Sequence, residues 1–182
     1  MTNLIPAALA FLKANWNVSM TGTSDTTALI GINPNTLKTR LARHQALTMR
    51  EHDGVQRGAL RFTGYHLVYN IIADRLLRYG FSIDAQGKDS DSENDQGWTA
   101  HVYAQWVFDE VLSGAGNADA ILRCKRDADG NTQILLFEDG DVVPFTGDAA
   151  MILPLGTMVV RLATTLFARF GGEAFHESLK AD

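Results

Sequence analysis

Side chains that can hydrogen-bond to nucleic acid are concentrated between residues 35 and 43. The segment TALIGINPNTLKTRL runs from Thr27 to Leu41, and Leu37 and Leu41 have the i, i+4 spacing of a buried helical stripe. The opposite face of that helix would carry hydrogen-bonding residues and bases: Asn35, Thr36, Lys38, Thr39 and Arg40, with Arg43 one turn further on. Such side chains read base edges and phosphates in a major groove.

Two helices joined by a tight turn would position this face. The first is predicted over 24–31, with Ser24 as N-cap and Gly31 at its C-terminal end. The second is predicted over 34–44, with Asn33 as cap and Pro34 at the first helical position. This is the pattern of a helix-turn-helix. An ordinary corner between two helices is the alternative for this segment alone.

Within this motif the residue types suggest separate roles. Lys38 or Arg40 would contact guanine and Asn35 would pair with adenine, because these are the favoured pairings in the major groove. Arg43 would hold a phosphate.

A β-hairpin is predicted directly after the two helices. Residues 47–62 contain two extended runs, LTMRE and GALRF, around a turn with Asp53-Gly54. Arg50, Arg57 and Arg61 lie on this hairpin and would grip the DNA backbone or enter the flanking minor groove. An amphipathic helix is predicted next, over 64–79. Tyr65 in its first turn would contact a phosphate, and His66 is expected on the surface.

The charge of the chain is divided unequally between its two parts. The net charge is −5, yet residues 1–80 hold nine Lys and Arg against four Asp and Glu, whereas residues 81–182 hold seven against 17. A phosphate backbone attracts a basic surface, so the first part is where a DNA-binding surface is expected. The acidic second part would repel DNA.

The 182 residues are predicted to form an α+β protein of two domains. A helix over 4–15 begins the DNA-binding domain, which would occupy 1–83. An acidic linker or loop follows at 84–97. The second domain, 98–182, would serve dimerisation or partner binding. Its predicted elements are an aromatic-rich helix over 98–113, strands over 119–126 and 132–138, an extended piece at 141–145 and a helix over 155–170.

The segment after the two helices resembles the DNA-binding domain of MerR-type winged-helix regulators. That family follows its helix-turn-helix with an arginine-bearing wing, an apolar helix and a Gly-Phe-Ser-Leu end. Here the chain runs RGALRFT from Arg57 to Thr63 and then ends the next helix with RYGFSI, from Arg78 to Ile83. The resemblance covers about residues 20–84 and implies a winged helix-turn-helix that binds double-stranded DNA.

The sequence also departs from this family. A helix at 4–15 precedes the helix-turn-helix, the acidic linker stands where the family has its long dimerising helix, and no cysteine cluster matches a metal-sensing site. The resemblance therefore does not imply a metal or redox sensor. Phage and mobile-element proteins use the same module, so a DNA-packaging or recombination accessory protein that marks a site and oligomerises stays open. A protein-interaction module without DNA binding is the other alternative.

Several classes of function are not supported by any motif. The single cysteine, Cys124, excludes an intramolecular disulfide framework and is expected in the core of a strand. The five histidines lack the spacing of a metal site, and no catalytic or nucleotide-binding motif occurs. We therefore expect no enzyme and no cofactor. No run is apolar for long enough to span a membrane, and the N-terminus lacks the pattern of a signal peptide, so a cytoplasmic protein is expected.

Together these observations predict a sequence-specific DNA-binding transcriptional regulator that acts by occupying an operator. A homodimer is expected, because one short recognition helix reads few base pairs and a two-fold site solves this. A protein partner would bind through the second domain.

Overall fold

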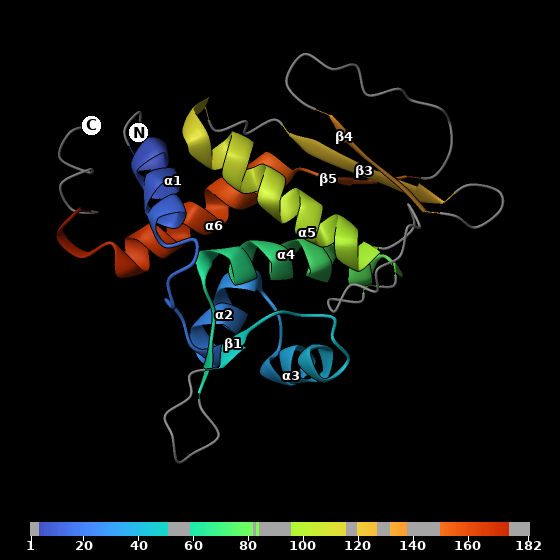
Figure 1. Ribbon diagram of the computed structural model, residues 1–182, viewed down its shortest axis with the longest axis horizontal. Helices are drawn as coiled ribbons and strands as arrows, with labels where there is room; N and C mark the ends of the chain where they lie inside the picture. The colour runs from blue at the N-terminus through green and yellow to red at the C-terminus, as the bar shows by residue number, and fades with distance from the viewer. Residues whose placement is uncertain are drawn as a thin grey trace.

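The computed structural model describes residues 4–50, 59–81, 83, 96–115, 120–126, 132–137 and 150–174. Helices and strands are both present, which confirms the α+β class (Figure 1). The elements, in chain order, are α1 (Leu4–Ala14), α2 (Thr23–Ile30), α3 (Pro34–Ala42), β1 (Met49–Arg50), β2 (Leu60–Arg61), α4 (Gly64–Arg78), α5 (Gln96–Trp106), the π-helix η1 (Val107–Ala115), β3 (Ile121–Arg126), β4 (Thr132–Phe137), β5 (Ala150–Leu153) and α6 (Leu155–Phe170).

The turn between α2 and α3 forms as its residue types predict. Gly31 has φ 71°, in the left-handed region that favours glycine, and ends α2. Asn33 caps α3, because its side-chain oxygen accepts from the Asn35 backbone N–H at 2.8 Å. The prediction for the start of α2 is wrong: that helix begins at Thr23 after Gly22, so Ser24 lies inside the first turn.

The two predicted extended runs pair as short antiparallel strands. Met49 lies opposite Arg61 and Arg50 opposite Leu60. An isolated bridge joins Phe62, just after β2, to Thr21, which precedes α2. The backbone before α2 is therefore tied to this strand pair. The turn that the sequence predicts between the strands, residues 51–58, lies outside the described residues.

Helix α4 is the central helix, and it is buried on several sides. Thr63 caps it by accepting from the His66 N–H, and the His66 ring accepts from the Thr63 N–H at 3.2 Å. Gly64 approaches the end of α1 so closely that a Cβ would lie 3.0 Å from the Asn15 oxygen and from the Trp16 Cα. The Gly64 N–H donates to that Asn15 oxygen at 3.1 Å. The helix that precedes the predicted motif therefore covers the N-terminus of α4.

The second half contains the predicted helix, strands and last helix, with two differences. The predicted helix over 98–113 begins earlier, at Gln96, and its second half is π-helical. The third strand of the sheet is β5 at Ala150–Leu153, which the sequence did not predict. The extended piece expected at 141–145 lies outside the described residues. The strand order is β4-β3-β5, and both pairs are antiparallel.

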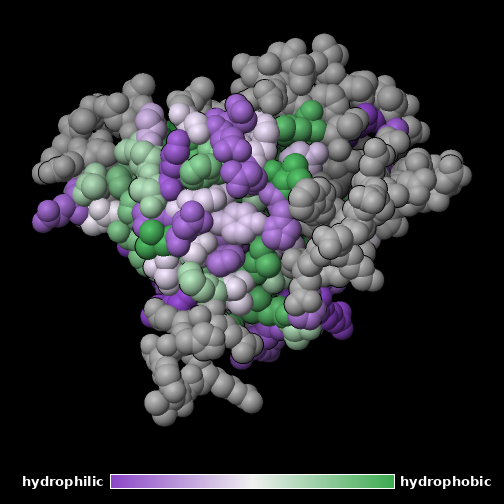
Figure 2. All heavy atoms as spheres, viewed as in Figure 1, coloured by the Kyte–Doolittle hydropathy of each residue, from purple (hydrophilic) through white to green (hydrophobic). Residues whose placement is uncertain are grey.

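One apolar core runs through both predicted domains. Helix α1 packs across α6, and α4 packs on α5 (Figure 1). Buried residues from both sides belong to the same cluster, including Leu12 and Tyr69 from the first half and Leu122, Leu155 and Leu166 from the second. On the coloured part of the face in Figure 2, polar and apolar side chains are interspersed. None of the described helices is both long and apolar enough to cross a membrane.

Candidate nucleic-acid interface

Helix α3 lies at one edge of the molecule (Figure 1), and the side chains on its outward face are polar. Leu37 is completely buried and fixes the orientation of the helix against the core. Most of the residues predicted to face DNA are exposed: Asn35, Thr36, Lys38, Thr39 and Arg43. The Thr39 hydroxyl donates back to the Asn35 carbonyl at 2.9 Å. The buried position of Leu37 therefore turns the neighbouring polar positions outward, as the i, i+4 spacing indicates.

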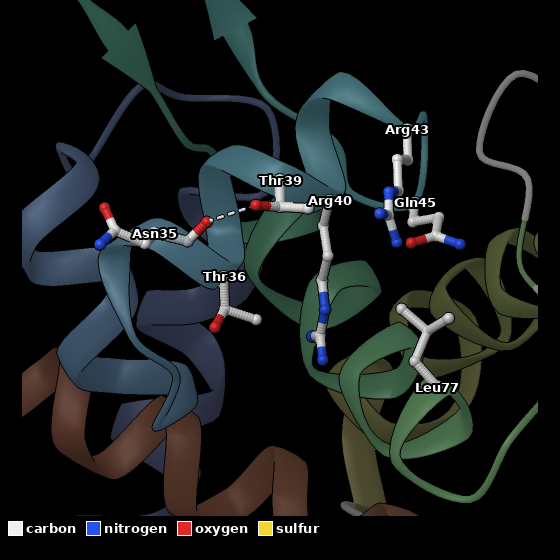
Figure 3. A pocket seen from close by; sticks show the side chains of 7 residues that line it. All are labelled: Asn35, Thr36, Thr39, Arg40, Arg43, Gln45 and Leu77. Atoms are coloured by element: carbon white, nitrogen blue, oxygen red, sulfur yellow. Dashed lines mark hydrogen bonds between the residues drawn. The ribbon is translucent and has the colours of Figure 1, made fainter.

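An open hollow of about 350 Å³ lies between this helix and the C-terminal end of α4. Seven residues line it: Asn35, Thr36, Thr39, Arg40, Arg43, Gln45 and Leu77. Figure 3 shows the Arg40 and Thr36 side chains pointing from α3 towards α4, and the Arg43 and Gln45 side chains lying close together beyond the end of α3. Five of the residues that the sequence singles out are thus brought together. Lys38 lies on the same helix, outside this lining.

A buried carboxylate holds Arg40 in place. Asp74 on α4 is fully buried, and its Oδ1 accepts from Arg40 Nη1 at 2.7 Å. Its second oxygen accepts from Arg78 Nε at 2.8 Å. Arg78 also donates through Nη2 to the Gly31 carbonyl at 3.1 Å. This arrangement, the Asp74 network, joins α4 to α3 and to the turn between α2 and α3.

The Asp74 network changes how Arg40 is understood. Only 14% of the Arg40 side chain is exposed, so the guanidinium is held by the protein rather than extended into solvent. A charge as buried as that of Asp74 needs such partners to offset its lost hydration. The sequence carried a signal for the Asp74–Arg78 pair alone, because Asp74 falls three residues after Ile71 on the apolar stripe of α4 and has Arg78 at i+4.

The strand pair is fixed to α4 by a buried amide. The Asn70 side chain is almost completely buried; it donates to the Leu47 carbonyl at 2.9 Å and accepts from the Leu47 N–H at 2.8 Å. The Thr48 hydroxyl donates across the pair to the Arg61 carbonyl at 2.9 Å. The backbone leading from α3 into β1 is therefore held at a defined position beside α3.

The structure places the predicted hairpin arginines unequally. Arg61 is half-buried in β2. Arg50 ends β1, with a side chain outside the described part of the structure, and Arg57 lies wholly outside the described residues.

Tyr65 lies in an aromatic cluster between α4 and α5, away from α3. Its hydroxyl hydrogen-bonds with the His101 Nδ1, and its ring meets the Trp16 ring edge-on at a centroid distance of 5.6 Å. Its backbone N–H already donates to the Trp16 carbonyl at 2.9 Å. Burial raises the pKa of the Tyr65 hydroxyl. The Trp16 carbonyl and the His101 ring therefore already bind the N–H and the hydroxyl of Tyr65, the residue that the sequence predicts to contact a phosphate.

His66 is not the surface residue that the sequence predicts. It is half-buried in the cap of α4, and this burial lowers the pKa of its ring.

Cys124 is buried in β3, as expected for a small core residue. Burial raises the pKa of its thiol to about 12. Burial also raises the pKa of the neighbouring Tyr103 hydroxyl to about 12, with a smaller contribution from the charge of Cys124. Among the described residues, no group of three or more His, Cys, Asp or Glu side chains could hold a metal ion.

No family model matches the chain, and no curated protein matches it significantly.

Proposed function

We propose that this chain binds double-stranded DNA in a sequence-specific manner and regulates transcription by occupying an operator. Helix α3 would enter the major groove, and the strands β1 and β2 would lie along the adjacent backbone as a wing. The observation that carries the proposal is the outward face of α3. It exposes amide, hydroxyl and basic side chains above a single buried leucine, Leu37.

The order of the elements supports the same function. The chain order is helix α1, the bridging residue Thr21, helices α2 and α3, and the paired strands β1 and β2, which is the order that the proposed winged helix-turn-helix would need. Three features hold the turn before α3 in place: the left-handed backbone of Gly31, the cap formed by Asn33, and the hydrogen bond from Arg78 of the Asp74 network to the Gly31 carbonyl. A recognition helix needs such fixed placement, because base contacts depend on its register in the groove.

Electrostatics favour an anionic partner at this surface. No acidic residue occurs between Asp25 and Glu51, a segment that contains all of α3. Asp25 pairs with Arg169, and the buried Asp74 is neutralised by its two arginines. The positive charges of Lys38 and Arg43 are thus opposed by no described acid of α3 or of the turn before it. A DNA backbone gains affinity from such charges by releasing its counterions.

Selection from a random duplex library at about 150 mM salt tests the proposal, because nonspecific binding is weakened there. The wild type is compared with Lys38→Ala and with Arg161→Ala, a control that removes one exposed positive charge from α6. We expect the wild type and the control to enrich one motif and Lys38→Ala to enrich it less. Failure of the wild type to enrich any motif would refute sequence-specific binding.

The proposed regulator is a homodimer, so the enriched motif should be an inverted repeat. Light scattering should give a mass of twice the 19.9 kDa chain. A ring of about eight or more copies would instead favour the packaging protein.

A further inference from the structure

We infer that the hollow between α3 and α4 holds one phosphate group of the DNA backbone; the inference rests on the proposed DNA binding. Arg40 and Arg43 would donate to its oxygens, with Gln45 as a neutral donor beside Arg43. This assignment takes Arg40 away from reading a base. The reading would then fall first to Lys38, which is exposed on α3 and lies outside the lining of the hollow.

The Asp74 network leaves Arg40 able to bind an anion. A guanidinium has five N–H donors, and Asp74 takes one of its nitrogens, Nη1, at 2.7 Å. A carboxylate behind the guanidinium fixes its plane while the rest of the group lines the hollow. A fixed donor loses little entropy when it binds a phosphate. A side chain that contacts a base edge, by contrast, has to extend into the major groove.

The composition of the hollow fits an anion attached to a sugar. Its lining contains two arginines, two threonines and two amides and has no acidic residue. Among the described residues, Arg43 has no acid partner, so its charge is available. The remaining lining residue, Leu77, offers an apolar surface on which a deoxyribose could pack. A volume of about 350 Å³, open to solvent, exceeds one phosphate and leaves space for the adjoining sugars.

The position of the hollow fits a backbone contact rather than a base contact. It lies beside α3, on the side where that helix faces the C-terminal end of α4 (Figure 3). When a helix lies in the major groove, its flanks face the phosphates on either side of the groove. Arg43 and Gln45 lie at and beyond the C-terminal end of α3, where the chain would leave the groove.

The experiment scans the duplex enriched by the wild type with single methylphosphonates. Each substitution makes one phosphate neutral. Binding of the full-length wild type, Arg43→Ala, Gln45→Ala and the Arg161→Ala control is measured by fluorescence anisotropy. At one backbone position in each half-site, we expect neutralisation to weaken wild-type binding about tenfold, the size of a charge-assisted contact. The same neutralisation should weaken binding of Arg43→Ala clearly less than that of the wild type, because that variant has already lost one of the two arginine contacts to this phosphate.

Two further readouts separate this contact from a general loss of charge. The slope of log affinity against log salt should become shallower by about one for Arg43→Ala and should stay unchanged for Gln45→Ala and Arg161→Ala. Gln45→Ala should nevertheless weaken binding. Neutralising the same phosphate should weaken binding of Gln45→Ala somewhat less than it weakens binding of the wild type. Each variant should also enrich the wild-type motif, since a phosphate contact carries no sequence information.

The results that overturn the inference differ from those that overturn the proposed function. If the wild type binds its duplex and every phosphate affects Arg43→Ala as much as the wild type, the hollow holds no phosphate and DNA binding stands. The inference also fails if Arg43→Ala alters the enriched motif. If the wild type binds no duplex at all, both proposals fail. Inorganic phosphate added at the same ionic strength should compete only weakly, because the site would recognise a phosphate within a DNA chain.

Discussion

Replacing Asp74 with asparagine removes the charge from a carboxylate that is fully buried and that joins α4 to two arginines. The neutral amide can accept one hydrogen bond through its oxygen, but its NH₂ group would face a guanidinium, donor against donor. Arg40, with 14% of its side chain exposed, would then be a nearly buried cation without a counter-ion. We expect Asp74→Asn to destabilise the folded state more than any substitution of a surface charge.

The magnitude follows from the exposure of the two partners. Breaking a buried ion pair by removing one partner costs about 3–5 kcal/mol. Arg78 is 47% exposed and can regain water when its partner is lost, so the lower end of that range applies. We therefore expect the free energy of unfolding to fall by about 3 kcal/mol. For a chain of this size that loss lowers the melting temperature by roughly 6–12 °C.

Urea unfolding followed by circular dichroism measures this change, with Asp25→Asn as the matched control. Asp25 makes the same kind of pair with Arg169 on the surface, where both side chains are partly exposed, so its loss should cost about 0–1 kcal/mol. The double variant Asp74→Leu, Arg40→Met should recover much of the lost stability, because it removes both buried charges together. A loss below about 1 kcal/mol for Asp74→Asn, equal to that of the control, would refute the reasoning.

Three other predictions concern groups that the structure buries. Asn70→Ala should lower the free energy of unfolding by about 2 kcal/mol in urea, because both polar groups of the Leu47 backbone lose their partner; an unchanged value would show that water replaces the amide. Cys124 should resist a thiol reagent at pH 8 until urea unfolds the chain, since burial raises the pKa of its thiol to about 12; rapid reaction of the folded protein would contradict its burial. Burial lowers the pKa of His66, so the unfolded chain takes up a proton first as the pH falls below about 6.5, and stability should decline there. His66→Gln should flatten that decline in urea titrations between pH 5 and 8, whereas an identical decline would assign it to other groups.

The local signals in the sequence located most of the elements. The caps and periodicity placed α3, α4 and α6 with starts at or within one residue of the predicted ones. These signals succeed because a cap or an apolar stripe involves residues only two to four positions apart. Strand β5 had no such signal: its four residues form a strand by pairing with β3, far away in the chain.

The candidate site was only partly predictable. The helix carrying Asn35, Thr36, Thr39 and Arg43 and its outward face could be inferred from the spacing of Leu37 and Leu41 alone. The contribution of Gln45 and Leu77 to the hollow could not be inferred in this way. Gln45 follows the end of α3, and Leu77 comes from another helix, α4. Tyr65 looked available for a phosphate in the sequence, yet in the fold its backbone N–H donates to the Trp16 carbonyl and its hydroxyl hydrogen-bonds with His101 of α5.

The sequence by itself determined which segments are helical, where the turn before α3 lies and which residue types that helix exposes. These properties depend on backbone preferences and side-chain spacing within one or two turns. Only the tertiary structure decided what the charged residues do. Arg40 and Asp74 are 34 residues apart, and their pairing depends on how α3 packs against α4. The free energy of a charge is set by its burial and its partners, and both arise only when distant segments meet.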